Sequence, residues 1–129
     1  MIDPAAKIMR FMETLDRSAL EDAFAPDNVT ILDSFPPYVF RGDNAVSAWA
    51  NGFINHAKNL AELSHTFGEP QEFSSSGQTA FFSLPVTWKG MSNGEPFLET
   101  GGLALMVVSM NNKWYIQNYG WAVTTYTSG

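Results

Sequence analysis

The sequence of 129 residues contains no cysteine and only two histidines, and charged residues make up only 16% of it. Without cysteine the chain can form no disulfide, no thiolate metal site and no thiol nucleophile. The two histidines lie at unrelated positions, so we expect no metal centre and no cofactor. Only seven Lys and Arg residues are present, and the net charge is −6. Nucleic-acid binding requires a basic stripe for the phosphates, so no nucleic-acid partner is expected.

The chain also lacks a long hydrophobic run. No stretch approaches the roughly 20 apolar residues that a membrane-spanning helix needs. The first residues, Met1–Lys7, have neither the basic region nor the apolar region of a secretory signal. We therefore expect no membrane partner and a cytoplasmic location.

Apolar residues are abundant by comparison, since hydrophobic residues make up 45% of the chain and aromatic residues 14%. The length is that of one domain, so residues 1–129 are expected to fold as a single unit. A high aromatic content with little charge to cover it suggests a second apolar surface beside the core. That surface would be either a cavity or a partner interface.

The first half of the chain predicts three helices and one short strand. Asp3, followed by proline, is typical of a helix start. Ser18–Glu21 has the form of a capping box and predicts a second, short helix. A strand over Val29–Leu32 follows. The third helix is expected to begin near Asp43 and to carry an apolar stripe.

After Leu60 the spacing of apolar residues changes from the helical period to a period of two residues, which indicates strands. A turn is expected at Ser74–Gly77. The predicted strands are Leu63–Phe67, Thr79–Lys89, Phe97–Met110 and Lys113–Thr125. Helices in the first half and hairpins in the second indicate an α+β fold with a curved, mainly antiparallel sheet.

The segment Leu103–Val108 is apolar on both faces. Helices can cover only one face of the sheet, so we predict a homodimer through the other.

Asp33 is the first candidate for chemistry. It directly follows the first predicted strand and lies among Phe35, Tyr38 and Phe40. A carboxylate beside aromatic rings is desolvated, which raises its pKa and suits it to act as a general base. The alternative is that its side chain caps the turn by bonding to nearby backbone.

His65 is the second candidate. It shares strand parity with Leu63 and Phe67, so its imidazole is expected to point inward with them. An inward histidine can act as a general acid or base, or can anchor a ligand. The alternative is a core histidine that is satisfied by one neighbour.

An aromatic pocket wall is predicted from the last strand, with further rings from the third helix and from the strand Thr79–Lys89. Rings with a few hydroxyl and amide groups are what a small amphipathic ligand requires. Aromatic core packing without a void is the alternative. The candidate ligand-binding residues are Trp49, Phe53, Trp88, Gln117, Tyr119 and Trp121.

In the segment Glu99–Gly102, two glycines lie within a predicted strand. They suggest bending of the sheet or the close approach of another backbone.

Four short motifs mark the order of the predicted elements. Phe24–Asp27 precedes the first strand, Arg41–Gly42 precedes the third helix, Gly68–Pro70 follows the next strand, and Lys113–Ile116 lies in the last strand. With the element order, this pattern resembles the nuclear transport factor 2-like superfamily, and within it the SnoaL-like branch. The resemblance implies a cystatin-like, cone-shaped α+β fold in which three N-terminal helices close a curved sheet around an apolar pocket. It also implies dimers through the outer sheet face. Members include ketosteroid isomerases, polyketide cyclases and non-catalytic binding modules.

The resemblance implies that Asp33 matches the proton-shuttling carboxylate of the isomerases and that Trp121 matches a pocket-lining tryptophan. The isomerases also have an oxyanion hole, made by a tyrosine of the first helix and an acid of the penultimate strand. This chain has Phe11 and methionines in the first helix, and Gly102 and Ala104 near the acid's place. Loss of one such donor costs on the order of a hundredfold in rate.

We therefore expect a dimer that binds a small apolar or amphipathic molecule, held by Trp121, Tyr119, His65 and Asp33. The alternative is an isomerase or cyclase that acts on a carbonyl compound, with Asp33 as general base and His65 or Tyr119 as donor. A third class is a protein-interaction module that uses the apolar sheet face.

Overall fold

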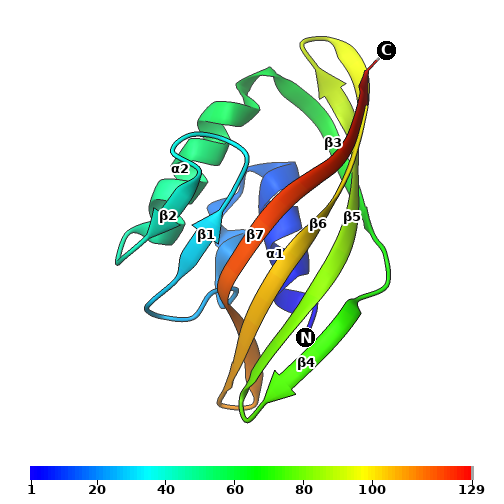
Figure 1. Ribbon diagram of the computed structural model, residues 1–129. Coiled ribbons are helices and arrows are strands. Elements are labelled where there is room, and N and C mark those ends of the chain that lie inside the picture. The colour runs from blue at the N-terminus through cyan, green and yellow to red at the C-terminus, as the bar shows by residue number, and fades with distance from the viewer. Residues whose placement is uncertain (129) are drawn as a thin grey trace.

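The computed structural model of the protein describes residues 1–128, which form a curved sheet with helices on its inner side (Figure 1). The order of the seven-stranded sheet is β2-β1-β7-β6-β5-β3, and β4 pairs with β5 outside this path. The β1–β7 pairing is parallel and the others are antiparallel, so the predicted mainly antiparallel α+β sheet is confirmed. The strands are β1 (Thr30–Leu32), β2 (Val39–Arg41), β3 (Leu60–Phe67), β4 (Gln71–Ser76), β5 (Thr79–Ser92), β6 (Glu95–Met110) and β7 (Lys113–Ser128).

Two α-helices cover the concave side of the sheet. Helix α1 (Asp3–Thr14) contacts β3 and β7, and α2 (Ala45–His56) contacts β1 and β2. Proline near the start of α1 and buried side chains at helical spacing agree with the predicted first helix. Helix α2 is followed by a 3₁₀ turn, η2 (Ala57–Asn59), before β3 begins.

Of the three predicted helices, the first and third are α-helices, and the second, short one is a 3₁₀ helix, η1 (Arg17–Leu20). Its N-cap is Asp16, whose carboxylate accepts a hydrogen bond from the Ser18 backbone N–H at 3.0 Å. The chain cannot continue as a helix because its backbone pairs with β7. Ala25 N–H donates to the Ile116 carbonyl, and Ile116 N–H donates to the Ala23 carbonyl, both at 2.8 Å.

One further local prediction is wrong, and one strand was missed. Residues 74–76, expected as part of a turn, belong to β4, because their backbone pairs with β5 although their side chains are polar and exposed. The short strand β2 was not predicted; it pairs with β1 and leads into α2.

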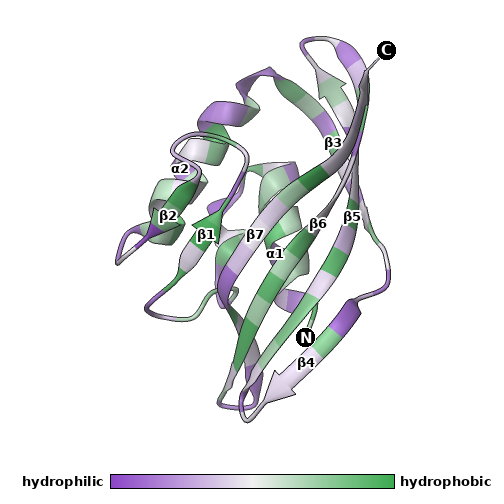
Figure 2. Cartoon of the chain, viewed as in Figure 1, coloured by the Kyte–Doolittle hydropathy of each residue, from purple (hydrophilic) through white to green (hydrophobic). Residues whose placement is uncertain are grey.

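The core lies between the helices and the concave face. Along β5 the even-numbered residues from Ala80 to Trp88 are buried, as their period-two pattern predicts. Hydrophobic bands recur along β5 and β6 in Figure 2. The largest fully buried side chains include Ile8, Phe11, Trp49, Phe82, Leu105 and Ile116.

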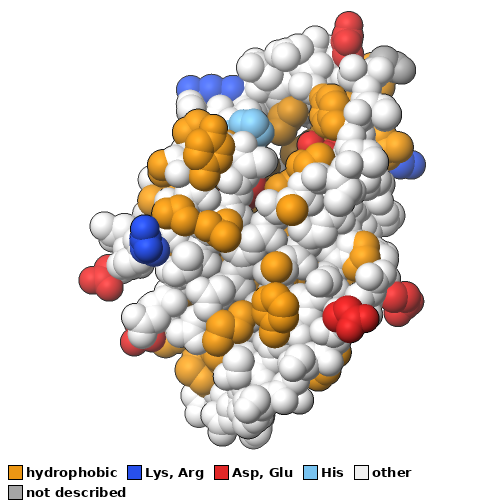
Figure 3. All heavy atoms as spheres, in the orientation of Figure 1, with side chains coloured by type: hydrophobic (Ala, Val, Ile, Leu, Met, Phe, Trp, Pro, Cys, Tyr) orange, Lys and Arg blue, Asp and Glu red, His pale blue; other side chains and the backbone are white. Residues whose placement is uncertain are grey.

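The helices leave the outer face of the sheet open. On β6, Ala104 is exposed, and Met106 and Val108 are half-buried. Phe81 on β5 is 49% exposed. Hydrophobic side chains are spread over this face in Figure 3. Homodimerisation through it stays a prediction.

Within residues 1–128, no helix combines the length and the apolar character that crossing a membrane would require.

Candidate functional site

A cavity of about 560 Å³ lies between the concave face of the sheet and the two α-helices. Figure 3 shows a hollow in the upper part of its view, where acidic side chains and a histidine gather among hydrophobic ones. Side chains from both helices and from the three long strands line the cavity. They include Met9 and Met12 of α1, Phe53 and His56 of α2, Trp88 of β5 and Trp121 of β7.

Asp33 lines this cavity although only 9% of it is exposed. It follows the last residue of β1, so the strand delivers it to the edge of the cavity. The Ser34 backbone N–H donates to Oδ1 at 2.7 Å. The Trp49 indole N–H donates to Oδ2 at 2.9 Å, and the Tyr119 hydroxyl donates to the same oxygen at 3.5 Å. Three parts of the chain therefore fix one carboxylate.

The surroundings of Asp33 favour its neutral form. Burial raises its pKa, and the hydrogen bonds from Trp49 and Ser34 offset only part of that effect. The folded state therefore binds the proton more tightly than the unfolded chain. The resulting stabilisation is complete below the unfolded pKa of about 3.9 and is lost as the pH rises through the higher folded pKa.

Burial, and secondly the charge of Asp33, raises the pKa of Tyr119 well above its usual value, so this hydroxyl remains a donor.

Both interpretations of Asp33 describe part of this geometry. The bond to the Ser34 N–H is the turn-capping contact of the structural alternative. The bonds from Trp49 and Tyr119 come instead from the core and leave an edge of the carboxylate facing the cavity. The Asp33 side chain is thus held in place by hydrogen bonds and is also accessible from the cavity.

Glu99 is a second carboxylate in the cavity wall. It is half-buried on β6, and burial, followed by the negative charge of Asp33, raises its pKa. In the sequence, Glu99 stood out only as part of the Glu99–Gly102 segment. The signal that could have identified it is parity, because Phe97, two residues earlier, also lines the cavity.

Gly101 makes room for Trp121 at the cavity wall. A Cβ atom at this glycine would lie 2.2 Å from the Ala122 carbonyl oxygen and 2.7 Å from the Trp121 ring. The predicted close approach of another backbone is therefore confirmed. The sheet register also shifts between Thr100 and Gly101, where the strand bulges.

The structure separates the predicted aromatic ligand-binding residues into two groups. Phe53, Trp88 and Trp121 line the cavity with Asp33. Trp49 and Tyr119 do not; they are buried behind Asp33, with their rings edge to face at 5.7 Å.

Gln117 lines a separate hollow of about 230 Å³. It was a candidate for the same pocket as Trp121, but the structure places it outside that cavity. The register of β7 against β6 shifts beside Gln117, because Met106 pairs with Asn118 but Val107 pairs with Ile116. This bulge interrupts the alternation of side chains.

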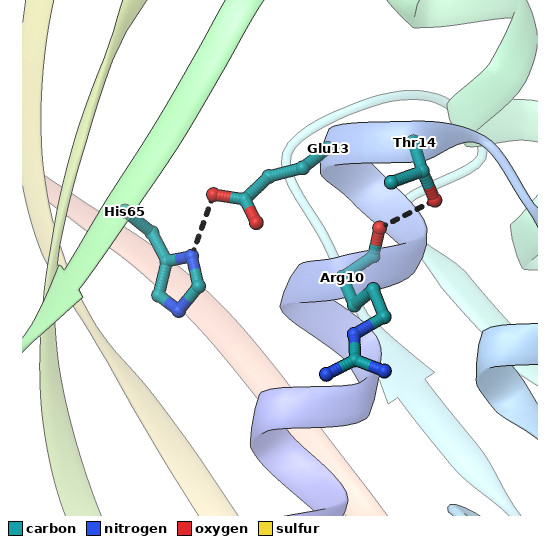
Figure 4. Close-up of polar contacts among 4 residues, drawn as sticks. All are labelled: Arg10, Glu13, Thr14 and His65. Atoms are coloured by element: carbon teal, nitrogen blue, oxygen red, sulfur yellow. Dashed lines mark hydrogen bonds and ion pairs between the residues drawn. The ribbon is translucent and has the colours of Figure 1, made fainter.

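His65 points inward as predicted, toward α1 and Trp88, but it does not line the cavity. Its Nδ1 lies 2.7 Å from Glu13 Oε2, as Figure 4 shows. The arrangement matches the alternative of a histidine satisfied by one neighbour. Glu13 lies 52 residues away in sequence, and no local pattern pointed to it.

His56, which was not among the candidate residues, lies in the cavity wall. Its ring stacks on Phe35 with centroids 5.3 Å apart. It is also close enough for its charge to lower the pKa of Asp33 slightly against the larger effect of burial. The signal was its position three residues after Phe53, on the same side of α2.

No protein-family model and no curated protein matches the chain. Solved structures match it at low sequence identity. The hexachlorocyclohexane dehydrochlorinase LinA-type3 from Novosphingobium barchaimii aligns with a TM-score of 0.80 and 9% identity, over 98% of this chain and 85% of that one. A nuclear transport factor 2-like superfamily protein from Salmonella enterica aligns with a TM-score of 0.75 and 13% identity, over 95% and 87%.

A third match is a protein of unknown function with a cystatin-like fold from Nostoc punctiforme. Its TM-score is 0.73 and its identity 14%, over 95% of this chain and 87% of that one. Identities this low show the fold alone. The predicted nuclear transport factor 2-like, or cystatin-like, fold is confirmed, and the SnoaL-like branch stays a prediction.

Replacement of Asp33 by asparagine should lower the pKa of Glu99. The substitution removes the negative charge that disfavours ionisation of Glu99, while burial keeps the Glu99 pKa above its ordinary value. Carbon-detected NMR titration of the side-chain carboxyl groups measures this shift. Asp43→Asn, which removes an exposed carboxylate outside the cavity wall, is the matched control. A Glu99 pKa that is unchanged in Asp33→Asn would show that the two carboxylates do not interact.

Proposed function

Starting from the nuclear transport factor 2-like fold, we propose that this protein binds a small apolar or amphipathic molecule in the cavity lined by Asp33 and Trp121. The observation that carries the proposal is the cavity itself, of about 560 Å³. Ligand sites are mostly apolar clefts of roughly 300–1,000 Å³ with a few placed polar groups. This cavity has aromatic walls and a fixed carboxylate, and so combines both features.

Within this proposal, two residues of the expected ligand set act indirectly. Tyr119 fixes the Asp33 carboxylate by its hydroxyl and does not reach the ligand. His65 joins β3 to α1 through Glu13 and thereby holds two walls of the cavity together. The residues proposed to contact the ligand directly are Trp121, Trp88 and Phe53.

Replacement of Trp121 by alanine should weaken the binding of a neutral apolar probe such as Nile red by about tenfold, or roughly 1.4 kcal/mol, because an aromatic wall is removed. The emission of the dye, titrated with protein, measures its affinity. Trp114→Ala removes a half-buried indole from the same strand outside the cavity and should leave the affinity within about twofold. Equal losses in the two variants would argue against binding in this cavity.

A second candidate function is proton transfer on a carbonyl compound, as in an isomerase or cyclase. It is favoured by a cavity-facing carboxylate whose pKa is raised by burial, which makes it a stronger base once ionised. In this step Asp33 takes a proton from the carbon beside the carbonyl, leaving an enolate and a neutral acid, and returns the proton to another carbon. A dehydrochlorinase among the structures with this fold is an analogy at the level of fold only.

The catalytic candidate predicts that the protein accelerates exchange of the α-protons of 3-cyclohexenone in D₂O, followed by proton NMR. Asp33→Asn should slow that exchange by about a hundredfold or more, the typical contribution of a general base. Asp43→Asn is the control for loss of a carboxylate outside the cavity. Exchange that is equally fast in Asp33→Asn and in the unmodified protein would refute Asp33 as the base.

We also propose that two copies pair through the outer sheet face. Support comes from the partly exposed apolar side chains Phe81 and Met106 on adjacent strands, which no helix covers. The alternative of a protein-interaction module would use the same face for another partner.

In sedimentation velocity the unmodified protein should behave as a dimer at micromolar concentration. Met106→Lys should shift it to monomer, because a buried charge without a partner opposes association. Leu15→Lys places the same charge at the exposed end of α1 and should leave the dimer intact. An unmodified protein that sediments as a monomer would contradict the proposal.

A further inference from the structure

The charge of the cavity wall is one-sided. Asp33 and Glu99 both line it, and among residues 1–128 no Lys or Arg does. In the same part of the chain, the other ionisable groups of the wall are His56 and the phenol of Tyr126. A ligand that carries a negative charge would therefore meet two carboxylates without a fixed cation to offset them.

The surroundings of Glu99 differ from those of Asp33. Asp33 has three hydrogen-bond donors, one from backbone and two from side chains. Burial and the charge of Asp33 raise the pKa of Glu99, and no hydrogen bond from residues 1–128 offsets them. Half-buried and facing the cavity, this carboxylate has no cationic partner within that part of the chain, although a charge removed from water needs one.

Two aromatic rings flank Glu99 across the sheet. Trp88 on β5 and Tyr126 on β7 are its direct partners in the strand register, so the three side chains form a row on one face. All three line the cavity. Phe97, whose ring stacks on Tyr126 at 5.8 Å between centroids, extends this aromatic surface.

A carboxylate between aromatic rings is suited to an organic cation. The carboxylate supplies the opposite charge, and the ring faces attract a cation through their quadrupoles. An ammonium bound here would also offset the repulsion that Asp33 exerts on Glu99. An apolar group on the same ligand would extend into the part of the cavity bounded by Met12, Phe53 and Leu103.

We propose that the cavity selects a hydrophobic amine, whose ammonium binds Glu99 between Trp88 and Tyr126. This inference rests on the proposed ligand-binding function and adds the chemical class of the ligand. It makes Glu99 the residue that determines specificity, whereas Asp33 faces the same cavity from the end of β1.

Three probes of nearly the same size separate charge from shape: 2-naphthylmethylamine, 2-naphthylmethanol and 2-naphthoic acid. At about pH 8 the amine is largely a cation, the alcohol is neutral and the acid is an anion. Isothermal titration calorimetry on the full chain should give at least about tenfold tighter binding of the amine than of the alcohol, and the weakest binding for the acid.

Glu99→Gln should remove the preference and bring the affinities for amine and alcohol together. Glu95→Gln changes an exposed glutamate of the same strand outside the cavity and should keep the preference. Alcohol that binds the unmodified protein as tightly as the amine, or a preference that persists in Glu99→Gln, would overturn the amine proposal and leave the binding function standing. Failure of all three probes and of Nile red to bind would overturn both. The comparison of probes on the unmodified protein decides the question even if Glu99→Gln does not fold.

Discussion

The structure depends on how one carboxylate is held at the boundary between core and cavity. Asp33 is almost fully buried, and a buried carboxylate without donors would strongly oppose folding. Trp49 and Tyr119 supply these donors from α2 and β7, and both are themselves core residues. The same two bonds therefore join a helix, a loop and the central strand, and they also aim the carboxylate at the cavity.

The cavity lies at the end of the sheet where the β5–β6 hairpin and the last part of β7 face the helices. Gly101 and the bulge beside it let β6 and β7 come close while the Trp121 ring turns to the inner face. The rest of the concave face is filled by tightly buried apolar side chains such as Leu105 and Phe82. Packing at one end and an opening at the other allow one sheet to carry both the stability and the site.

Patterns that are local in sequence predicted much of this molecule. The alternation along β5, the start of α1 and the position of Asp33 after a strand each follow from a few neighbouring residues. Features that depend on distant pairing were missed. The bulge that turns Gln117 away is set by register against β6, and the partner of His65 lies on a different element. Period and capping rules describe one segment at a time, so they contain no information on such contacts.

Helix α1 presents methionines, Met9 and Met12, where it borders the cavity. Methionine is unbranched and has a polarisable sulfur, so it adapts its shape to a neighbour at little energetic cost. The opposite walls carry rigid indole and phenyl rings. One side of the cavity can thus mould itself to ligands of different outline while the other keeps a fixed contour. Such a division favours tolerance for a series of related molecules over strict recognition of a single one.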